Sequence, residues 1–413
     1  MSDVLALSQA LFDSYFLNFS PEKGGLSGLL DYGIADGPLG LLLTAITGMH
    51  NRPEPLWEES AGRLAKGIVQ TLNQNGLPSG FGLMVGLAGY PFVFRLAGVP
   101  TMLKVADQLD DFLYKRLDTL LQKAPLPLAT PAFDVIYGFA GTARYLLDRA
   151  PEDTRAEALL RRILELFVRA SIDPLKGFFA PSDFAVLDAS EADTDEPKHF
   201  SMGMSHGIPG VLMLLALAFQ KGIHVQGQKE AMVSLGQCIE QSLYLGPYGL
   251  DVPSMLALPS GEAEETEVAK RAGWCYGIPG VALPMWVAGE AIGSESLRQV
   301  ARNLTESLAN RTFDQLMLSH AGLCHGYAGT MHIWRYLKGI LGIADNRREH
   351  ELIGAILKSH RPDLAFGFAS PFAEKAATGD PSFLEGGAGI VLAWMSFEEN
   401  LVGLPWDQVL MLS

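Results

Sequence analysis

Two cysteines and a histidine have the residue types and the relative positions of a metal site. Cys275 and Cys324 each stand two residues before the first glycine of a Gly-x-x-Gly motif, and His325 directly follows Cys324. Two thiolates and an imidazole suit Zn²⁺, and three protein ligands leave a fourth position for chemistry. The spacing is not that of a zinc finger, and the alternative is that these side chains simply pack in the core. The pattern predicts a catalytic zinc site and no other cofactor.

The glycine motif recurs, which is how residues far apart in the sequence could meet. Seven copies follow one another at intervals of roughly 50 to 70 residues. Their first glycines are Gly37, Gly86, Gly138, Gly207, Gly277, Gly326 and Gly386. In a curved or closed array of repeats, equivalent positions of adjacent units lie side by side. We therefore expect Cys275 and Cys324, with His206, Tyr276 and His325 directly before their glycines, to converge on one rim.

Helical periodicity surrounds the motifs. Apolar stretches follow most copies, as in Val211 to Phe219, and amphipathic stretches such as Arg155 to Ser171 lie between them. Two helices per repeat is the economical interpretation, and we expect the glycines to allow close approach between crowded inner helices. Such hairpins must stack, either as an open solenoid or as a ring. The long stretches Ser182 to Phe200 and Ser254 to Glu267 are predicted to be loops over the mouth of the array.

Composition excludes several classes of function. The 413 residues are 48% apolar and 19% charged, with a formal net charge of -15, so a folded protein is expected and nucleic acid is not. No apolar stretch reaches the roughly 20 residues that span a bilayer, and the first residues do not resemble a secretory signal. The protein is expected to be cytoplasmic, without direct membrane insertion. Cys238 lies outside the motifs and is expected to be a packing residue.

Four segments carry a resemblance to a known family. They are Phe-Asp-Val-Ile-Tyr-Gly (133–138), His-Gly-Ile-Pro-Gly (206–210), Gly-Trp-Cys-Tyr-Gly (273–277) and Cys-His-Gly (324–326). In this order, on seven repeats, they resemble the lanthionine synthetase C-like family over nearly the whole chain. The resemblance implies an all-α fold, an α/α toroid with a double ring of helices built from seven helical-hairpin repeats, forming one domain over residues 1–413.

The resemblance also implies an activity. Family members of this size are lanthipeptide cyclases, lyase-type enzymes that form carbon–sulfur bonds. They add peptide cysteine thiols to dehydroalanine or dehydrobutyrine in a Michael-type addition, which closes (methyl)lanthionine thioether rings. The implied cofactor is Zn²⁺, held by Cys275, Cys324 and His325. The implied partners are a dehydrated precursor peptide with leader and core, a dehydratase and an export transporter, which could bring the protein to the membrane periphery.

Four further residues are candidates for catalysis within this resemblance. His206 suits proton transfer, and Asp134 matches the family's catalytic aspartate and could orient that histidine. Arg271 could stabilise an anion, and Tyr276 could hydrogen-bond the reacting groups. The structural alternatives are a helix N-cap for Asp134 and a rim salt bridge for Arg271. His320 and His332 are expected to be supporting or core residues, and Glu385 a helix-start carboxylate.

Three other functions remain open from the sequence. Some relatives add glutathione to dehydrated residues of damaged proteins, and the zinc residues do not separate that activity from ring closure. A noncatalytic helical scaffold that binds a peptide is a second possibility, although the full set of candidate residues speaks against it. A glycoside-processing toroid is a third, but such enzymes use paired carboxylates, and a cysteine pair has no role there.

Overall fold

Helices make up most of the part of the chain that the computed structural model describes. That part comprises residues 2–18, 33–51, 54–181, 199–257, 271–371, 379–398 and 405–413. The all-α prediction is confirmed, since the few strands present are two or three residues long. The two stretches predicted as mouth loops lie mostly outside the described residues.

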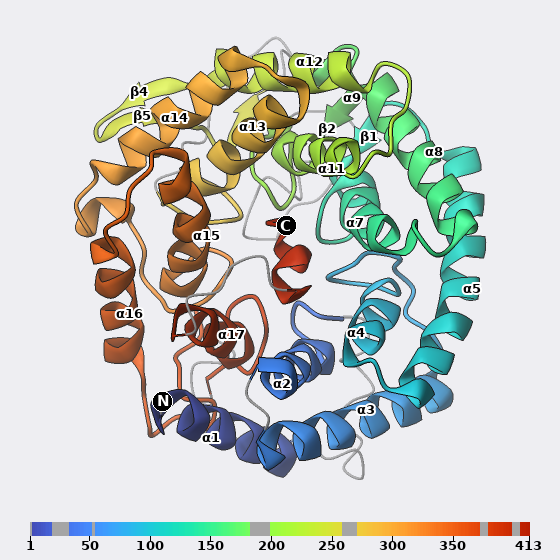
Figure 1. The fold of residues 1–413 in the computed structure, drawn as a ribbon, viewed down its shortest axis with the longest axis vertical. Helices are drawn as coiled ribbons and strands as arrows, with labels where there is room; N and C mark the ends of the chain where they lie inside the picture. Colours follow the sequence, from blue (N-terminus) through green and yellow to red (C-terminus); the bar gives the residue numbers. More distant parts are fainter. Residues whose placement is uncertain are drawn as a thin grey trace. The chain divides into compact units, whose positions relative to one another are not determined.

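A helix follows each of the seven glycine motifs, as predicted, and we call these the motif helices (Figure 1). They are α2 (Pro38–Asn51), α4 (Gly89–Ala97), α7 (Phe139–Arg149), α11 (Ile208–Gln220), α13 (Ile278–Ile292), α15 (Tyr327–Ile340) and α17 (Gly387–Glu398). Several are apolar all round, and every residue from Ile208 to Ala218 in α11 is buried. A helix that is hydrophobic on all sides must be enclosed by other elements.

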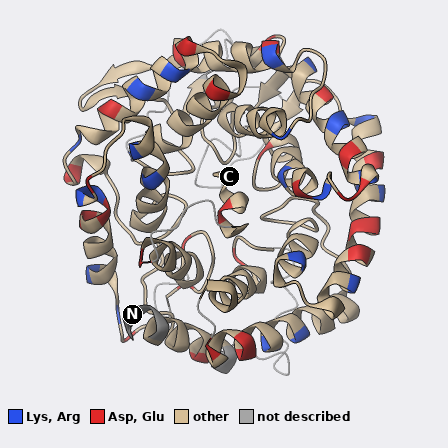
Figure 2. Ribbon diagram, viewed as in Figure 1, with Lys and Arg blue, Asp and Glu red and all other residues tan. Residues whose placement is uncertain are grey.

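A second set of helices covers the motif helices and is amphipathic. These covering helices are α1 (Ser2–Asn18), α3 (Pro55–Asn75), α5 (Pro100–Lys123), α8 (Thr154–Ala170), α12 (Gln228–Ser242), α14 (Glu295–Ala309) and α16 (Arg347–Ser359). Their sequences place apolar residues on one face, and the side chains of Asp153 and Ser294 cap the starts of α8 and α14. Charged residues gather on covering helices such as α5, α8 and α14, while α11 carries none (Figure 2).

The described chain divides into two compact units. Unit 1 contains residues 1–113, 318–335 and 345–410, and unit 2 contains 114–317, 336–344 and 411–413. In unit 1, α2 packs against α3, α4 and α17. In unit 2, α11 packs against α7, α12 and α13, and α13 packs against α14. The expectation of a single domain over residues 1–413 stays a prediction.

The seventh repeat takes its covering helix from the start of the chain. No helix pairs with α17 among the described residues that follow it, where only the short 3-10 helix η5 (Pro405–Leu410) is present. Instead α1 packs on α17, and the buried Leu11 lies so close to Gly387 that an added Cβ would sit 2.8 Å from its methyl group. The first and last segments of the described chain therefore build one repeat together.

The motif glycines are explained by close approach within their own loops and, at some of them, by crowding from the neighbouring motif, since a Cβ on Gly389 would also lie 2.5 Å from Cδ1 of Leu323. A Cβ on Gly329, the second glycine of the sixth motif, would lie 1.7 Å from the carbonyl oxygen of Leu323. The corresponding distance for Gly389 to the carbonyl oxygen of Phe383 is 1.9 Å. Real Cβ atoms do not approach backbone so closely. Each motif thus folds the loop back tightly onto the first turn of its helix.

Short strands brace the loops of unit 2. β1 (Leu128–Ala129) pairs in parallel with β2 (Phe178–Phe179), and β4 (Tyr244–Gly246) forms a hairpin with β5 (Gly249–Asp251). β3 (His199–Ser201) pairs antiparallel with β6 (Met255–Ala257). β3 and β6 belong to the two predicted mouth loops, so the described ends of these loops are joined to each other. The sequence analysis did not anticipate this pairing.

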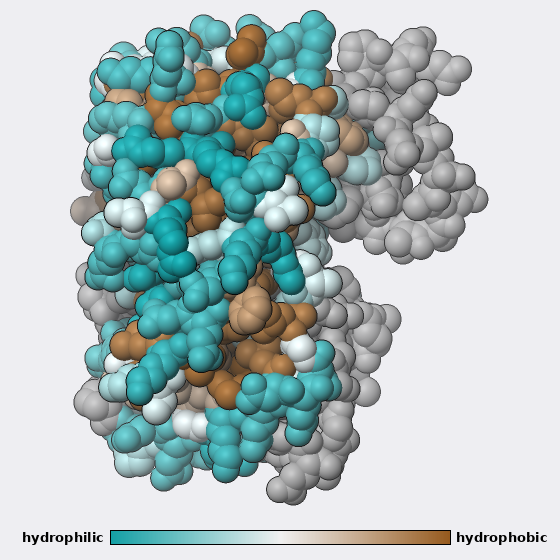
Figure 3. All heavy atoms as spheres, turned by 90° about the vertical axis from the view of Figure 1, so that its right-hand side faces the viewer, coloured by the Kyte–Doolittle hydropathy of each residue, from teal (hydrophilic) through white to brown (hydrophobic). Residues whose placement is uncertain are grey.

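The remaining described elements are short. They are α6 (Thr130–Phe133), α9 (Pro174–Gly177) and the 3-10 helix η3 (Asp314–Leu316). On the face drawn in Figure 3, hydrophilic side chains cover most of the area, with hydrophobic groups between them. Among the helices that the structure describes, none has both the length and the apolar character needed to cross a membrane.

Candidate functional site

Main-chain hydrogen bonds join the motif loops of unit 1 in a regular pattern. The N–H groups of Leu323 and Cys324 donate to the carbonyl oxygen of Leu384 at 2.7 and 2.9 Å. The N–H of Leu384 in turn donates to the carbonyl oxygen of Ala35 at 3.2 Å. Backbone hydrogen bonds thus join equivalent positions of neighbouring repeats.

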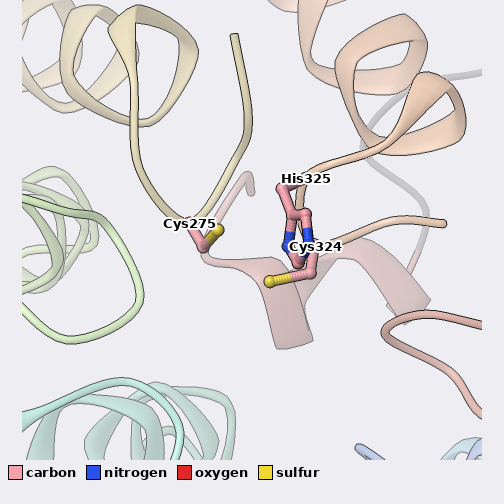
Figure 4. Close-up of side chains that lie close together, drawn as sticks. All are labelled: Cys275, Cys324 and His325. Carbon is pink, nitrogen blue, oxygen red and sulfur yellow. The ribbon is translucent and has the colours of Figure 1, made fainter. Parts of the chain in front are cut away.

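The predicted zinc ligands come together. The sulfur atoms of Cys275 and Cys324 and a ring nitrogen of His325 all lie within 4.8 Å of one another, and Figure 4 shows how the three side chains gather. Cys275 is buried, and Cys324 and His325 are half-buried. The two cysteines occupy the same position of consecutive motifs, which is the register from which the sequence predicted a shared site.

The donor set fits a zinc ion. Typical Zn–S distances of about 2.3 Å and Zn–N distances of about 2.0 Å place the ligand atoms of a tetrahedral site roughly 3.5 to 3.8 Å apart. The upper limit of 4.8 Å between these three atoms is near that range, so small side-chain rotations would complete the geometry. Two soft sulfur ligands and one imidazole favour zinc over calcium or magnesium, which take oxygen ligands.

Asp134 and His206 form a close pair in unit 2, as the sequence analysis anticipated. Oδ2 of Asp134 lies 2.6 Å from Nδ1 of His206. Oδ1 of the same carboxylate accepts hydrogen bonds from the N–H groups of Tyr137 and Gly138 at 2.7 and 2.8 Å. Asp134 therefore closes the turn before α7 and also holds the histidine. The N-cap alternative is wrong, because Gly138 is the residue that caps α7: one oxygen of Asp134 bonds to N–H groups before the helix, and the other contacts His206.

The surroundings of this pair fix its orientation. The N–H of Val135 donates to the carbonyl oxygen of Ser205 at 3.0 Å, so the backbone next to Asp134 is tied to the backbone next to His206. The exposed ring of Tyr137 stacks on the His206 ring, with 6.0 Å between centroids and 15° between planes. His206 is half-buried and keeps 23% of its side chain exposed, so it can reach a substrate.

Burial dominates the electrostatics of Asp134. Complete burial raises the pKa of the Asp134 carboxyl above its ordinary value, while the hydrogen bonds from His206, Tyr137 and Gly138 lower it. The carboxylate form therefore depends on these three donors. Because an ionised carboxylate can only accept hydrogen bonds, it places the proton of His206 on Nδ1 and leaves Nε2 as the nitrogen that faces other groups.

Tyr276 lies next to the acid–base pair. Its hydroxyl is 3.4 Å from the Ser201 hydroxyl, and its ring centroid is 6.5 Å from that of His206. A Cβ on Gly203 would lie 2.5 Å from the Tyr276 ring, so the ring packs directly on this glycine. The structure thus brings Tyr276 to the pair together with its sequence neighbour Cys275.

Arg271 shows less agreement with its predicted role. Its carbonyl oxygen packs against Gly277, where an added Cβ would lie 2.3 Å away, and its side chain is half-buried. Among the residues that the structure describes, no ion pair or hydrogen bond of this side chain is found. The rim salt bridge is therefore not observed among the described residues, and the proposed role of Arg271 toward an anion rests on the motif alone.

Glu385 and His320, which the sequence analysis interpreted as structural or supporting residues, lie against the candidate zinc ligand His325. Oε1 of Glu385 is 3.1 Å from Nδ1 of His325, and Oε2 is 3.6 Å from Nδ1 of His320. The three side chains form a second group whose ligand atoms all lie within 4.8 Å of one another. Sequence reasoning missed this contact of Glu385, although its register with His325 was visible and could have revealed it.

Cys238 and His332 belong to neither the candidate zinc site nor the Asp134–His206 pair. Cys238 is a half-buried residue of α12, and burial raises the pKa of its thiol to about 11. His332 is fully buried, with Nε2 at 3.2 Å from the buried carboxylate of Asp407 and its ring 4.5 Å from that of Trp406. Both agree with their interpretation as packing residues.

Comparison with known proteins bears on the fold and on the family. A solved structure of nisin cyclase superposes with a TM-score of 0.77 at 22% identity and covers 93% of each chain. This likeness shows the α/α toroid fold that the sequence predicted. Nisin biosynthesis protein NisC of Lactococcus lactis subsp. lactis is 24% identical over 297 residues, which is 69% of this chain and 65% of that protein. The chain thus spans slightly under two thirds of that curated relative.

A family model provides the broadest match. Residues 28–411 match the model for lanthionine synthetase C-like proteins, which covers nearly every described element and all seven glycine motifs. The chain belongs to the lanthionine synthetase C-like family.

Proposed function

We propose that this protein is a lanthipeptide cyclase. It would add cysteine thiols of a dehydrated precursor peptide to dehydroalanine or dehydrobutyrine and so form (methyl)lanthionine rings. The observation that carries the proposal is the grouping of Cys275, Cys324 and His325 within 4.8 Å. Family membership and the likeness to nisin cyclase support it.

The proposed cofactor is one zinc ion held by these three side chains. When bound, zinc lowers the pKa of a coordinated thiol, so that the thiol is present as the thiolate nucleophile at neutral pH. The family resemblance and the donor chemistry support this assignment, and the remaining roles belong to side chains of the protein itself.

His206 is the proposed proton-transfer residue. In the reaction the sulfur bonds to the β-carbon of the alkene, the thiol loses its proton, and the α-carbon gains one. With Nδ1 bound to Asp134, Nε2 of His206 can take the first proton and return one to the α-carbon. Asp134 keeps the imidazole in that tautomer and orientation, and Val135 ties the two loops together.

Tyr276 and Arg271 are proposed to act on the developing enolate. The Tyr276 ring centroid lies 6.5 Å from that of the half-buried His206, and the Tyr276 hydroxyl could donate to a carbonyl oxygen that becomes negative in the transition state. The positive charge of Arg271 would stabilise the same oxygen. This role is supported by the position of Arg271 in the loop that carries Cys275.

The first experiment compares zinc content and ring formation in the wild type and in Cys324→Ala. Elemental analysis should find one zinc per chain in the wild type and a large loss in the variant. Ring formation leaves the peptide mass unchanged, so iodoacetamide is added to count the cysteines that remain free. The wild type should remove alkylatable thiols from a dehydrated precursor, and the variant should not.

Other outcomes would select a different function. A dehydrated peptide that gains mass only when glutathione is supplied would favour the glutathione-adding activity. A wild type that binds no zinc when prepared without chelators, and that leaves all thiols free, would favour a noncatalytic peptide-binding scaffold. We further propose cytoplasmic action beside a dehydratase and an export transporter, which co-purification with those two proteins would test.

A further inference from the structure

Glu385 places a carboxylate against the candidate zinc ligand His325, and it occupies the same motif position as that histidine. It directly precedes Gly386 in the seventh motif, the position that His325 occupies in the sixth motif and His206 in the fourth. Its side chain is only 7% exposed. Burial of a carboxylate is unfavourable unless other groups compensate it, so a function at this position would explain why it is present.

The contacts of Glu385 point to His325. Oε1 lies 3.1 Å from Nδ1 of His325, which is within hydrogen-bonding distance for N–H and O. Oε2 lies 3.6 Å from Nδ1 of His320, and the two imidazole rings meet edge to face with centroids 4.6 Å apart. The carboxylate therefore lies between two imidazoles of the same loop.

The backbone keeps the carboxylate in this place. The N–H groups of Leu323 and Cys324 both donate to the carbonyl oxygen of Leu384, the residue before Glu385. Gly322 leaves the space that the carboxylate fills, since a Cβ there would lie 2.7 Å from Oε2 and 2.9 Å from the Cα of Glu385. The loop that carries two candidate ligands is thus fixed to the loop that carries Glu385.

His320 and His325 differ in whether Nδ1 can donate a proton to Glu385. The N–H of Gly322 donates to Nδ1 of His320 at 3.2 Å, so this nitrogen acts as an acceptor and the neutral ring carries its proton on Nε2. His320 then presents no Nδ1 proton to Glu385. The Nδ1 proton of a neutral His325 is the one that the carboxylate can accept.

We infer that Glu385 is a positioning residue for the metal centre. Its carboxylate takes the Nδ1 proton of His325 as a hydrogen bond, which turns Nε2 toward the metal and makes that nitrogen a stronger donor. Metal-binding histidines depend in this way on a carboxylate or carbonyl that receives their second N–H, and loss of that partner weakens metal binding about 10- to 100-fold. This inference rests on the proposed zinc site.

The test is the zinc affinity of the full chain, measured by competition with a chromophoric chelator. The variants are Glu385→Ala, which removes the carboxylate, and Glu385→Gln, which keeps its size and one carbonyl oxygen. The control is Asp407→Asn, because Asp407 is a buried carboxylate of the same unit that contacts a different histidine, His332, at 3.2 Å. Circular dichroism confirms that each variant is folded.

We expect zinc binding to weaken about 10- to 100-fold in Glu385→Ala, less in Glu385→Gln, and by less than about twofold in Asp407→Asn. With cobalt as a probe, the visible absorption bands should change in Glu385→Ala and not in the control. Sulfur-to-cobalt charge transfer should persist in every variant, since both cysteines remain.

Opposite results are easy to recognise. A wild type with one zinc and a Glu385→Ala variant of equal affinity would overturn the inference and leave the proposed function intact. The inference also fails if Asp407→Asn weakens zinc as much as Glu385→Ala, because that effect would come from general destabilisation. Cobalt without any sulfur charge transfer in the wild type would place the metal on His320, His325 and Glu385, and a wild type without metal would overturn the proposed function as well.

Discussion

One oxygen of the Asp134 carboxylate bonds to the backbone before α7, and the other contacts His206. Oδ1 receives the N–H groups of Tyr137 and Gly138, and Oδ2 lies 2.6 Å from Nδ1 of the histidine. A single side chain thus shapes the loop before α7 and selects the tautomer of a residue from the next repeat. Removing only the charge should separate these two effects.

Asp134→Asn should therefore impair catalysis more than folding. The substituted side-chain amide would keep an oxygen for the two backbone N–H groups but would present an NH₂ group to Nδ1 of His206, which reverses the histidine tautomer. We expect ring formation to slow by about 100-fold or more, as for loss of a general base, with zinc content unchanged. The rate comes from time courses of thiol alkylation.

Gly329→Ala should destabilise the protein, because its Cβ would lie 1.7 Å from the carbonyl oxygen of Leu323. Relief of such a clash costs about 1 to 3 kcal/mol in a packed core. Gly339 on the same helix, α15, is the matched control, since a Cβ there meets nothing within 4 Å. Gly339→Ala should be neutral or slightly stabilising because alanine favours helix. Urea denaturation of both variants would show equal midpoints if the motif glycines were dispensable.

Cys238 should be an unreactive thiol at neutral pH. Burial, with the nearby charge of Asp173, raises its pKa from 9.0 to about 11, so the thiolate that reacts with iodoacetamide is scarce at pH 8 and grows about tenfold per pH unit. In a Cys275→Ser, Cys324→Ser double variant only this thiol remains. Its alkylation rate should reach half of its maximum near pH 11, and in urea near pH 9. A folded-state midpoint near pH 9 would contradict the burial effect.

Phe12→Ala should show that α1 is part of the fold. Phe12 is 1% exposed and packs edge to face on Trp57, with ring centroids 6.0 Å apart. Truncation of such a buried ring costs about 3 to 5 kcal/mol. Phe112→Ala is the comparison, because that ring is 54% exposed and its loss should change stability little. Thermal unfolding that moves equally in both variants would argue against the role of α1.

Much of the fold could be predicted from one short repeat. The glycine motif predicted the seven motif helices because its cause is local: each glycine avoids a clash with its own loop, as Gly329 does with Leu323. The covering helix of α17 could not be found in this way. Its partner α1 comes from the opposite end of the sequence, and helical periodicity does not reveal which distant helix packs on which.

The grouping of the candidate zinc ligands could be predicted from their positions in the glycine motifs. Cys275 and Cys324 occupy the same motif position, His325 follows Cys324, and the three ligand atoms lie within 4.8 Å of one another. Their role as zinc ligands stays a prediction. Glu385 has the same register, but a carboxylate before a helix has an ordinary explanation, so only its burial and its distance to His325 reveal the contact. The motif position of Arg271 predicts a contact with an anion of the reaction, and that role stays a prediction.

The pairing of α1 with α17 also bears on how the protein is made. A ribosome releases α1 long before α17, so the apolar side chain of Leu11, which packs against α17, stays without this neighbour until α17 has been made. Contacts so distant in sequence form slowly, because the chain must close a very long loop. This part of the fold can form only after α17 has left the ribosome, and until then α1 exposes an apolar face to which a chaperone could bind.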